Sequence, residues 1–215
     1  MPARYALSMT TDALRSAYGV SGPGPIWLPS WNVAPGQPAP VIRRPDRGTG
    51  RALDLMFWGL VPSWTTTMDR RSSHARCETL AESGMFRAAF RSRRCLIPAS
   101  AFYGRIADRP YACARRDGQP LAFAGLWDLW GLDGDTLRGF AVVTTDAPDG
   151  LLPGTARFPV LLPAEAWEAW LNAPPREART LMHPALPDVL RCWPISGRVR
   201  DPAQNDAHLL DPLAI

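Results

Sequence analysis

The sequence contains no lysine, so all 24 of its basic residues are arginines, set against 20 aspartates and glutamates. A GC-rich coding sequence is one explanation for this replacement. The physical consequence is the same whatever the origin, because a planar guanidinium group forms bidentate contacts with phosphate and stacks on nucleobases better than an ammonium group does. The formal net charge of +4 is therefore carried by cations that all suit an anionic partner.

Long hydrophobic runs and a cleavable leader are also missing. No apolar stretch reaches the roughly 18 residues that a transmembrane helix needs. The first residues, Met1–Tyr5, lack the apolar segment that secretory signals carry. We therefore expect a cytoplasmic protein without a membrane span.

Cysteine is scarce, and its spacing does not indicate a metal site. The chain has no C-x-x-C pair and no cysteine–histidine grouping with zinc spacing. Thiols stay reduced in the cytoplasm, so free, buried thiols are expected at all four positions. These positions are Cys77, Cys95, Cys113 and Cys192. Nothing in the sequence implies a cofactor.

The positive charge is concentrated in one segment. Between Arg70 and Arg94 seven arginines face only Glu78 and Glu82, an excess of five positive charges, so the rest of the chain sums to −1. A local patch of this kind favours an anionic partner such as nucleic acid.

Periodicity and turn residues predict one α+β domain over residues 1–215 in which strands predominate. Thr10–Asp12 can cap a short helix that ends near Gly19, and a second helix begins at Pro163. Apolar residues alternate in one strand, expected near 52–60, at Leu53, Leu55 and Phe57. The other strands are expected near 40–44, 95–103, 110–115, 121–128, 138–144, 158–162 and 190–196, with loops over 22–40 and 61–84.

Two further patterns concern turns and a helix. Asp117-Gly118 and Asp133-Gly134 are typical of hairpin turns. The segment Met85–Arg94 has the periodicity of an amphipathic helix. Its arginines recur at helical spacing and predict a solvated helix face; they are Arg87, Arg91 and Arg94.

Several ordered segments resemble one family nearly from end to end. They are Arg4-Tyr5, Trp31–Pro35, Phe57–Trp64, Ala75–Thr79, Met85–Phe90, Arg94–Ala99, Phe123–Trp127, Arg157–Val160, Trp167–Leu171 and Val199–Asn205. This pattern is similar to that of the SOS-response-associated peptidase (SRAP) family. The resemblance implies a distorted, barrel-like mixed sheet with flanking helices and a groove for single-stranded DNA. It also implies a role in the DNA damage response, with localisation at the nucleoid.

Active members of that family use an N-terminal cysteine, exposed by methionine removal, to capture the aldehyde of an abasic site as a stable thiazolidine. The resemblance assigns proton transfer to a glutamate and a histidine, and positioning to an asparagine. This chain has different residues at all four positions: Pro2 stands for the cysteine, His74 for the asparagine, Gly104 for the glutamate and Thr155 for the histidine. Without a thiol the thiazolidine cannot form, so we expect neither the crosslink nor the autopeptidase activity of the family.

The positions that the family uses against DNA are retained. The resemblance assigns backbone contacts to Arg4, Arg76 and Arg157, and contact with bases to Trp64. Arginine on phosphate combined with aromatic stacking holds single strands without reading their sequence. The alternatives are a core aromatic role for Trp64 and structural salt bridges for Arg76 and Arg157, to Glu78 or an aspartate.

Three functions follow from these residues. The first is a monomeric protein that binds single-stranded DNA, including abasic DNA, without catalysis. The second is an abasic-site lyase, in which the free amine of Pro2 forms an iminium ion and His74 moves protons. A polar residue that only fills the space of the asparagine is the favoured alternative for His74. The third is a scaffold for a protein partner in the damage response.

Overall fold

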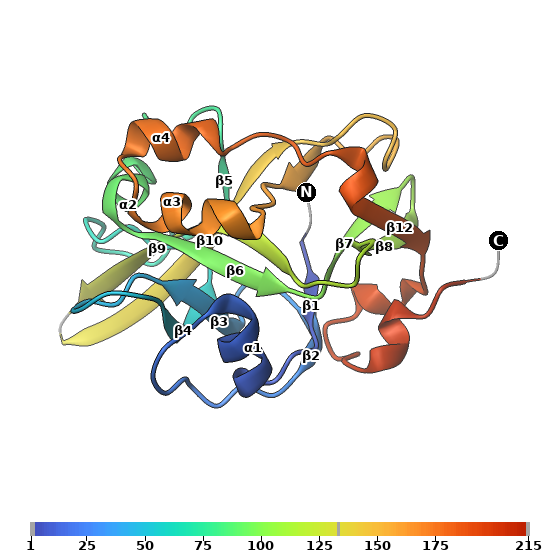
Figure 1. Ribbon diagram of the computed structural model, residues 1–215, viewed down its shortest axis with the longest axis horizontal. Helices are drawn as coiled ribbons and strands as arrows, with labels where there is room; N and C mark the ends of the chain where they lie inside the picture. The colour runs from blue at the N-terminus through green and yellow to red at the C-terminus, as the bar shows by residue number, and fades with distance from the viewer. Residues whose placement is uncertain (1–2, 133, 214–215) are drawn as a thin grey trace.

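The computed structural model describes residues 3–132 and 134–213, which form two β-sheets with short helices around them (Figure 1). The larger sheet has the strand order β11-β10-β4-β3-β6-β9. Because β9 also pairs with β10, five of these strands close into a ring. The strands are β3 (Pro38–Arg43), β4 (Ala52–Trp58), β6 (Arg94–Ala99), β9 (Leu121–Leu132), β10 (Asp135–Asp146) and β11 (Arg157–Pro159). The predicted α+β class with a distorted, barrel-like sheet is thus confirmed.

The smaller sheet is antiparallel and has the order β12-β8-β7-β1-β2. Only Ser100 separates β6 from β7, so the chain passes from one sheet to the other at this residue. The strands are β1 (Tyr5–Leu7), β2 (Ser30–Val33), β7 (Ala101–Ile106), β8 (Arg109–Arg115) and β12 (Leu190–Pro194).

The helices are short and lie outside the sheets (Figure 1). The α-helices are α1 (Thr11–Tyr18), α2 (Arg87–Ser92), α3 (Trp167–Asn172) and α4 (Pro175–Thr180). The 3₁₀ turns are η1 (Ala164–Ala166), η2 (Pro187–Val189), η3 (Gly197–Arg200) and η4 (Ala207–Leu210). In the described part of the chain no helix has both the length and the apolar character to cross a membrane.

Helix α1 has the predicted ends. The Thr10 side chain accepts a hydrogen bond from the amide of Ala13, and Gly19 ends the helix in the left-handed region with φ 61°. Both features are common helix signals, because the cap satisfies a free amide and glycine tolerates positive φ.

The prediction of a solvated arginine face over Met85–Arg94 is wrong at its last residue. Arg87 and Arg91 are exposed, but α2 ends at Ser92 and Arg94 is the first residue of β6, where it is buried. Its guanidinium group donates hydrogen bonds to the carbonyls of Phe90, Trp170 and Ala173. Because these carbonyls lie at the C-terminal ends of α2 and α3, a cation is favourable there.

Strand β4 buries a different set of side chains from the one that its apolar alternation suggests. Leu53 is buried, but Leu55 and Phe57 are exposed, whereas Met56 and Trp58 are fully buried. The face that packs on the core therefore changes within the strand.

The predicted loops contain two short strands, and one predicted hairpin turn is absent. Strand β2 lies within residues 22–40, and β5 (His74–Arg76) lies within 61–84 and pairs in parallel with β10. Asp117-Gly118 joins β8 to β9, which belong to different sheets, so it is not a hairpin turn. The β9–β10 hairpin is present, with Gly134 at φ 93°, although Asp133 lies outside the described residues.

The prediction of four free thiols is wrong for two of them. Cys113 on β8 and Cys192 on β12 face each other in the strand register and form a disulfide. Cys77 and Cys95 are free; Cys95 is buried as expected, whereas Cys77 is only half-buried. The pair is 79 residues apart in the sequence, so spacing alone gives no indication of it.

Candidate functional site

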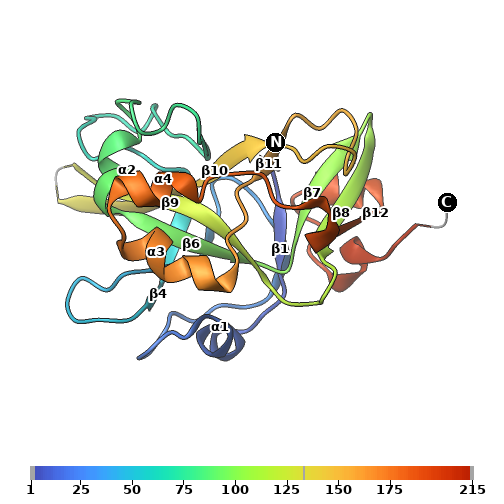
Figure 2. The ribbon, with the colours of Figure 1, turned by 45° about the horizontal axis from the view of Figure 1, so that its top comes forward.

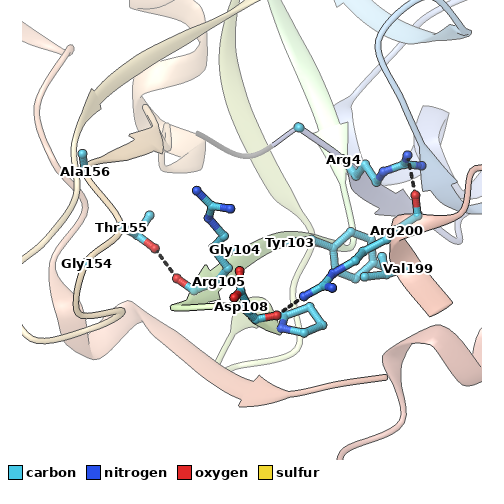
Figure 3. Close-up of a pocket in the computed structure, with 12 residues that line it drawn as sticks. Arg4, Tyr103, Gly104, Arg105, Asp108, Gly154, Thr155, Ala156, Val199 and Arg200 are labelled. Carbon is cyan, nitrogen blue, oxygen red and sulfur yellow. Dashed lines mark hydrogen bonds between the residues drawn. The ribbon is translucent and has the colours of Figure 1, made fainter. Parts of the chain in front are cut away.

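A cavity of about 600 Å³ lies where four segments of the chain meet (Figure 3). These segments are the start of β1, the β7–β8 hairpin, the loop between β10 and β11, and η3. Figure 2 shows the β10–β11 loop beside the tips of β7 and β8. Its lining residues are Ala3, Arg4, Tyr103, Gly104, Arg105, Asp108, Pro110, Gly154, Thr155, Ala156, Val199 and Arg200. The fold thus brings together three of the predicted site residues: Arg4, Gly104 and Thr155.

The terminal methyl group of Leu152 occupies the space directly beside Gly104 and would have to shift to admit a side chain there. A Cβ atom added there would lie 2.5 Å from Cδ1 of Leu152, closer than real Cβ contacts come. Leu152 is buried, so an apolar side chain occupies the direction in which a side chain at residue 104 would start. Position 104 therefore contributes no acid or base to the cavity.

Thr155 holds the two walls of the cavity together. Its hydroxyl group donates a hydrogen bond of 2.7 Å to the backbone carbonyl of Arg105, as Figure 3 shows. The contact links the β10–β11 loop to the β7–β8 hairpin. A threonine hydroxyl is a poor acid–base group near neutral pH, so its role here is structural.

Arg4 and Arg200 are fixed by neutral acceptors. Arg4 donates to Oδ1 of Asn32 at 3.2 Å and to the carbonyl of Arg200 at 3.0 Å. Arg200 in turn donates to the carbonyl of Asp108 (Figure 3). Within the described residues neither guanidinium group is ion-paired with a carboxylate, so both positive charges remain uncompensated.

Two predicted residues lie on β5, outside the lining of this cavity. His74 and Arg76 share one face of the strand, because side chains alternate and the intervening Ala75 is fully buried. The Nδ1 atom of His74 lies 2.9 Å from Oγ of Ser73, and its ring packs edge-on against Trp58. Arg76 is exposed, and its guanidinium group contacts no described side chain through a hydrogen bond or ion pair.

Arg157 is held in a dense set of ion pairs. It donates to both carboxylate oxygens of Glu78, at 2.7 and 2.9 Å, to Asp146 at 2.9 Å and to the carbonyl of Thr144 at 2.6 Å. Its side chain is only 14% exposed. The hydrogen bonds from Arg157 lower the pKa of Glu78 to about 2. The structural salt bridge considered as an alternative for Arg157 is therefore present. Arg76 forms no such ion pair with a described residue.

Trp64 lies at the surface, so its alternative role as a core aromatic is wrong. The side chain is 54% exposed. Its indole N–H donates to the carbonyl of Gly84 at 3.1 Å, and the Arg70 guanidinium group lies 5.6 Å from the ring centroid. An exposed ring that is fixed at one edge can stack on a base.

Pro2 lies outside the described residues. In the described part of the chain no three histidine, cysteine, aspartate or glutamate residues gather as a metal site would require.

The family model for the SOS response associated peptidase (SRAP) matches residues 1–202. The chain belongs to the SRAP family. The Bacillus subtilis abasic site processing protein YoaM is 31% identical over 196 residues, which are 86% of each chain. The Escherichia coli abasic site processing protein YedK is 30% identical over 192 residues, covering 85% of this chain and 84% of YedK.

Solved structures agree with this SRAP fold. A crystal structure of a Bacteroides thetaiotaomicron protein has a TM-score of 0.87 at 22% identity and covers 99% of this chain and 100% of its own. A Bordetella bronchiseptica protein has a TM-score of 0.78 at 27% identity, covering 90% of this chain and 98% of its own.

Sequence reasoning missed three charged residues of the SRAP cavity. Arg105 follows Gly104 directly, and Asp108 lies in the same hairpin. Arg200 comes from a segment that was matched to the family without a role. Only the tertiary fold brings η3 to the start of β1, so no spacing in the sequence could have joined these residues.

Proposed function

We propose that this SRAP protein binds single-stranded DNA, including strands with an abasic site, and that it does so without a covalent crosslink. Relatives at about 30% identity are named abasic site processing proteins, which associates the chain with damaged DNA. The observation that carries the proposal is the exposed guanidinium group of Arg76, which no described carboxylate compensates. A cation in this state is available to a phosphate.

Two further residues support binding of a single strand. The described hydrogen bonds of Arg4 go to neutral acceptors, so no described carboxylate offsets its positive charge. Trp64 presents an exposed aromatic surface, which suits unpaired bases. Arg157 contributes less to binding in this proposal, because Glu78 and Asp146 compete with phosphate for its donors.

The absence of a crosslink follows from the residues at the reacting positions. A thiazolidine needs an amine and a thiol on one residue, and proline at position 2 supplies no thiol. Gly104 has no acidic side chain, and the Thr155 hydroxyl group donates to a backbone carbonyl. Losing general acid–base groups alone costs roughly 10²–10⁴-fold in rate. We further propose that the protein acts as a monomer at the nucleoid.

Substitution of Arg76 tests the binding proposal. Arg76→Glu places a negative charge next to the bound backbone, so we expect it to abolish binding of a labelled single-stranded oligonucleotide, measured by fluorescence anisotropy. Binding by the unaltered protein should weaken with salt, with a log–log slope of about −0.7 for each phosphate contacted.

Arg91→Glu is the matched control, since Arg91 is an exposed arginine on α2 outside the proposed contacts. It makes the same change in net charge and should leave the affinity close to that of the unaltered protein. Equal affinities of the Arg76→Glu variant and the unaltered protein would remove the main support for the proposal.

A further inference from the structure

The cavity beside Gly104 carries an excess of positive charge that no described ion pair compensates. Three guanidinium groups line it, from Arg4, Arg105 and Arg200, against the single carboxylate of Asp108. Arg157, by contrast, is neutralised by Glu78 and Asp146. Among the described residues none of the three cavity arginines forms an ion pair.

The donors of these arginines are only partly used. A guanidinium group has five N–H donors. Arg4 uses its terminal nitrogens on Asn32 and the carbonyl of Arg200, and Arg200 uses one on the carbonyl of Asp108. The Arg105 side chain donates to no described residue, and Figure 3 shows it extending into the space between Thr155 and Arg4. Arg105 is thus the freest cation of the lining.

The backbone around Arg105 is fixed even though its side chain is free. Its carbonyl accepts the hydrogen bond from Thr155, and residue 105 pairs with Pro110 in the β7–β8 hairpin. Both contacts hold the point from which the side chain extends. Because the backbone at Arg105 is already held in place, less conformational entropy is lost when the guanidinium group binds a ligand.

The small residues of the lining leave room for an anion. Gly154 and Ala156 border the cavity, and the terminal methyl group of Leu152 lies where a side chain at residue 104 would begin. The volume of about 600 Å³ exceeds the needs of a bare phosphate and leaves space for the attached sugar.

We propose that this cavity is a phosphate-binding site, in which Arg105 is the principal donor and Arg4 and Arg200 supply the supporting charge. Arginine forks match the geometry of phosphate oxygens and form charge-assisted hydrogen bonds with them. The phosphate comes from a nucleic acid strand, either at its end or within its backbone. This last step rests on the proposed single-strand binding, whereas the phosphate site itself does not.

Inorganic phosphate as a probe tests the phosphate site separately from the proposed binding of single-stranded DNA. Isothermal titration calorimetry at constant ionic strength would compare the unaltered protein with Arg105→Ala and Arg109→Ala. Arg109 is an exposed arginine of the same hairpin that does not line the cavity, so its variant controls for lost net charge. Losing charge-assisted hydrogen bonds should weaken phosphate binding by at least about tenfold in Arg105→Ala. Arg109→Ala should bind phosphate as the unaltered protein does.

Equal phosphate affinity of Arg105→Ala and the unaltered protein would overturn the assignment, as would the absence of phosphate binding by the unaltered protein. Phosphate binding that depends on Arg105, in a protein that binds no single-stranded DNA, would reject the proposed function and keep the phosphate site. Competition of oligonucleotides, with and without terminal phosphates, against inorganic phosphate identifies which part of the strand supplies the bound phosphate. Stronger competition by phosphorylated ends assigns a strand end, and equal competition assigns the backbone.

Discussion

At the scale of single residues, charge compensation separates the arginines that stabilise the fold from those that are free to bind. Arg157 and Arg94 are both held, the first by carboxylates and the second by helix-end carbonyls. Arg76 and Arg105 are exposed, with no ion pair to any described residue. Sequence reasoning raised the salt-bridge alternative for Arg157. It placed Arg94 wrongly on a solvated helix face, because the acceptors of Arg94 come from α2 and α3 and are brought together only by the fold.

The Glu78–Arg157 pair should make stability depend on pH in the acid range. The pKa of Glu78 is lowered from 4.5 in the unfolded chain to about 2 in the fold. A depressed carboxylate pKa adds stability that is present above the unfolded value and is lost as pH falls from about 4.5 toward 2. Glu78→Gln removes this contribution, so it should be destabilising near neutral pH and nearly neutral close to pH 2.

Urea unfolding at about pH 7, 4.5 and 2.5 would measure the effect. The Glu78 side chain is 45% exposed, so solvent screening reduces the size of the contribution but not its direction. Glu82→Gln is the control, because Glu82 lies 3.7 Å from Arg179 in a more exposed pair. A difference between Glu78→Gln and the unaltered protein that stays constant across this pH range would contradict the account.

At the scale of secondary structure elements, the sequence predicted those elements that carry their own signals. The cap and the C-terminal glycine identified α1, and the apolar runs identified most strands of the ring. Strands β2 and β5 were missed because each has at most four residues and lies in a segment with turn-like composition. Their strand conformation depends on pairing with β1 and β10, which is tertiary information.

The disulfide ties the edge strand β12 to β8, and its removal should be costly. A cross-link between residues 79 positions apart reduces the conformational entropy of the unfolded chain. In typical cases this stabilises the fold by about 2–4 kcal/mol. The Cys113→Ala/Cys192→Ala double variant should therefore have a lower urea midpoint, whereas Cys77→Ala should stay close to the unaltered protein.

Alkylation under denaturing, non-reducing conditions followed by intact mass provides an independent check. Two modified cysteines, Cys77 and Cys95, are expected. Four modified cysteines in freshly purified protein would show that the Cys113–Cys192 bond is not formed.

At the scale of the whole molecule, the family and its fold could be predicted from ordered sequence blocks, but the chemistry of the cavity could not. The blocks identified the SRAP fold because they recur along nearly the whole chain, and the family match over residues 1–202 agrees. The cavity combines residues from both ends of the chain, from Arg4 to Arg200, and its positive charge results from that meeting. Substituted positions such as Gly104 indicated which acid–base groups of the family this chain lacks. Only the fold showed which arginines line the cavity.

The most direct test of the central claim combines one oligonucleotide with two gels. Purified protein, with its N-terminal mass determined, is mixed with labelled single-stranded DNA that contains one abasic site. We expect a shifted band on the native gel and no covalent band on the denaturing gel, with or without borohydride. A band that requires borohydride and a free Pro2 would instead indicate iminium chemistry. A crosslink that survives denaturation without borohydride would contradict the claim that this protein binds DNA without covalent capture.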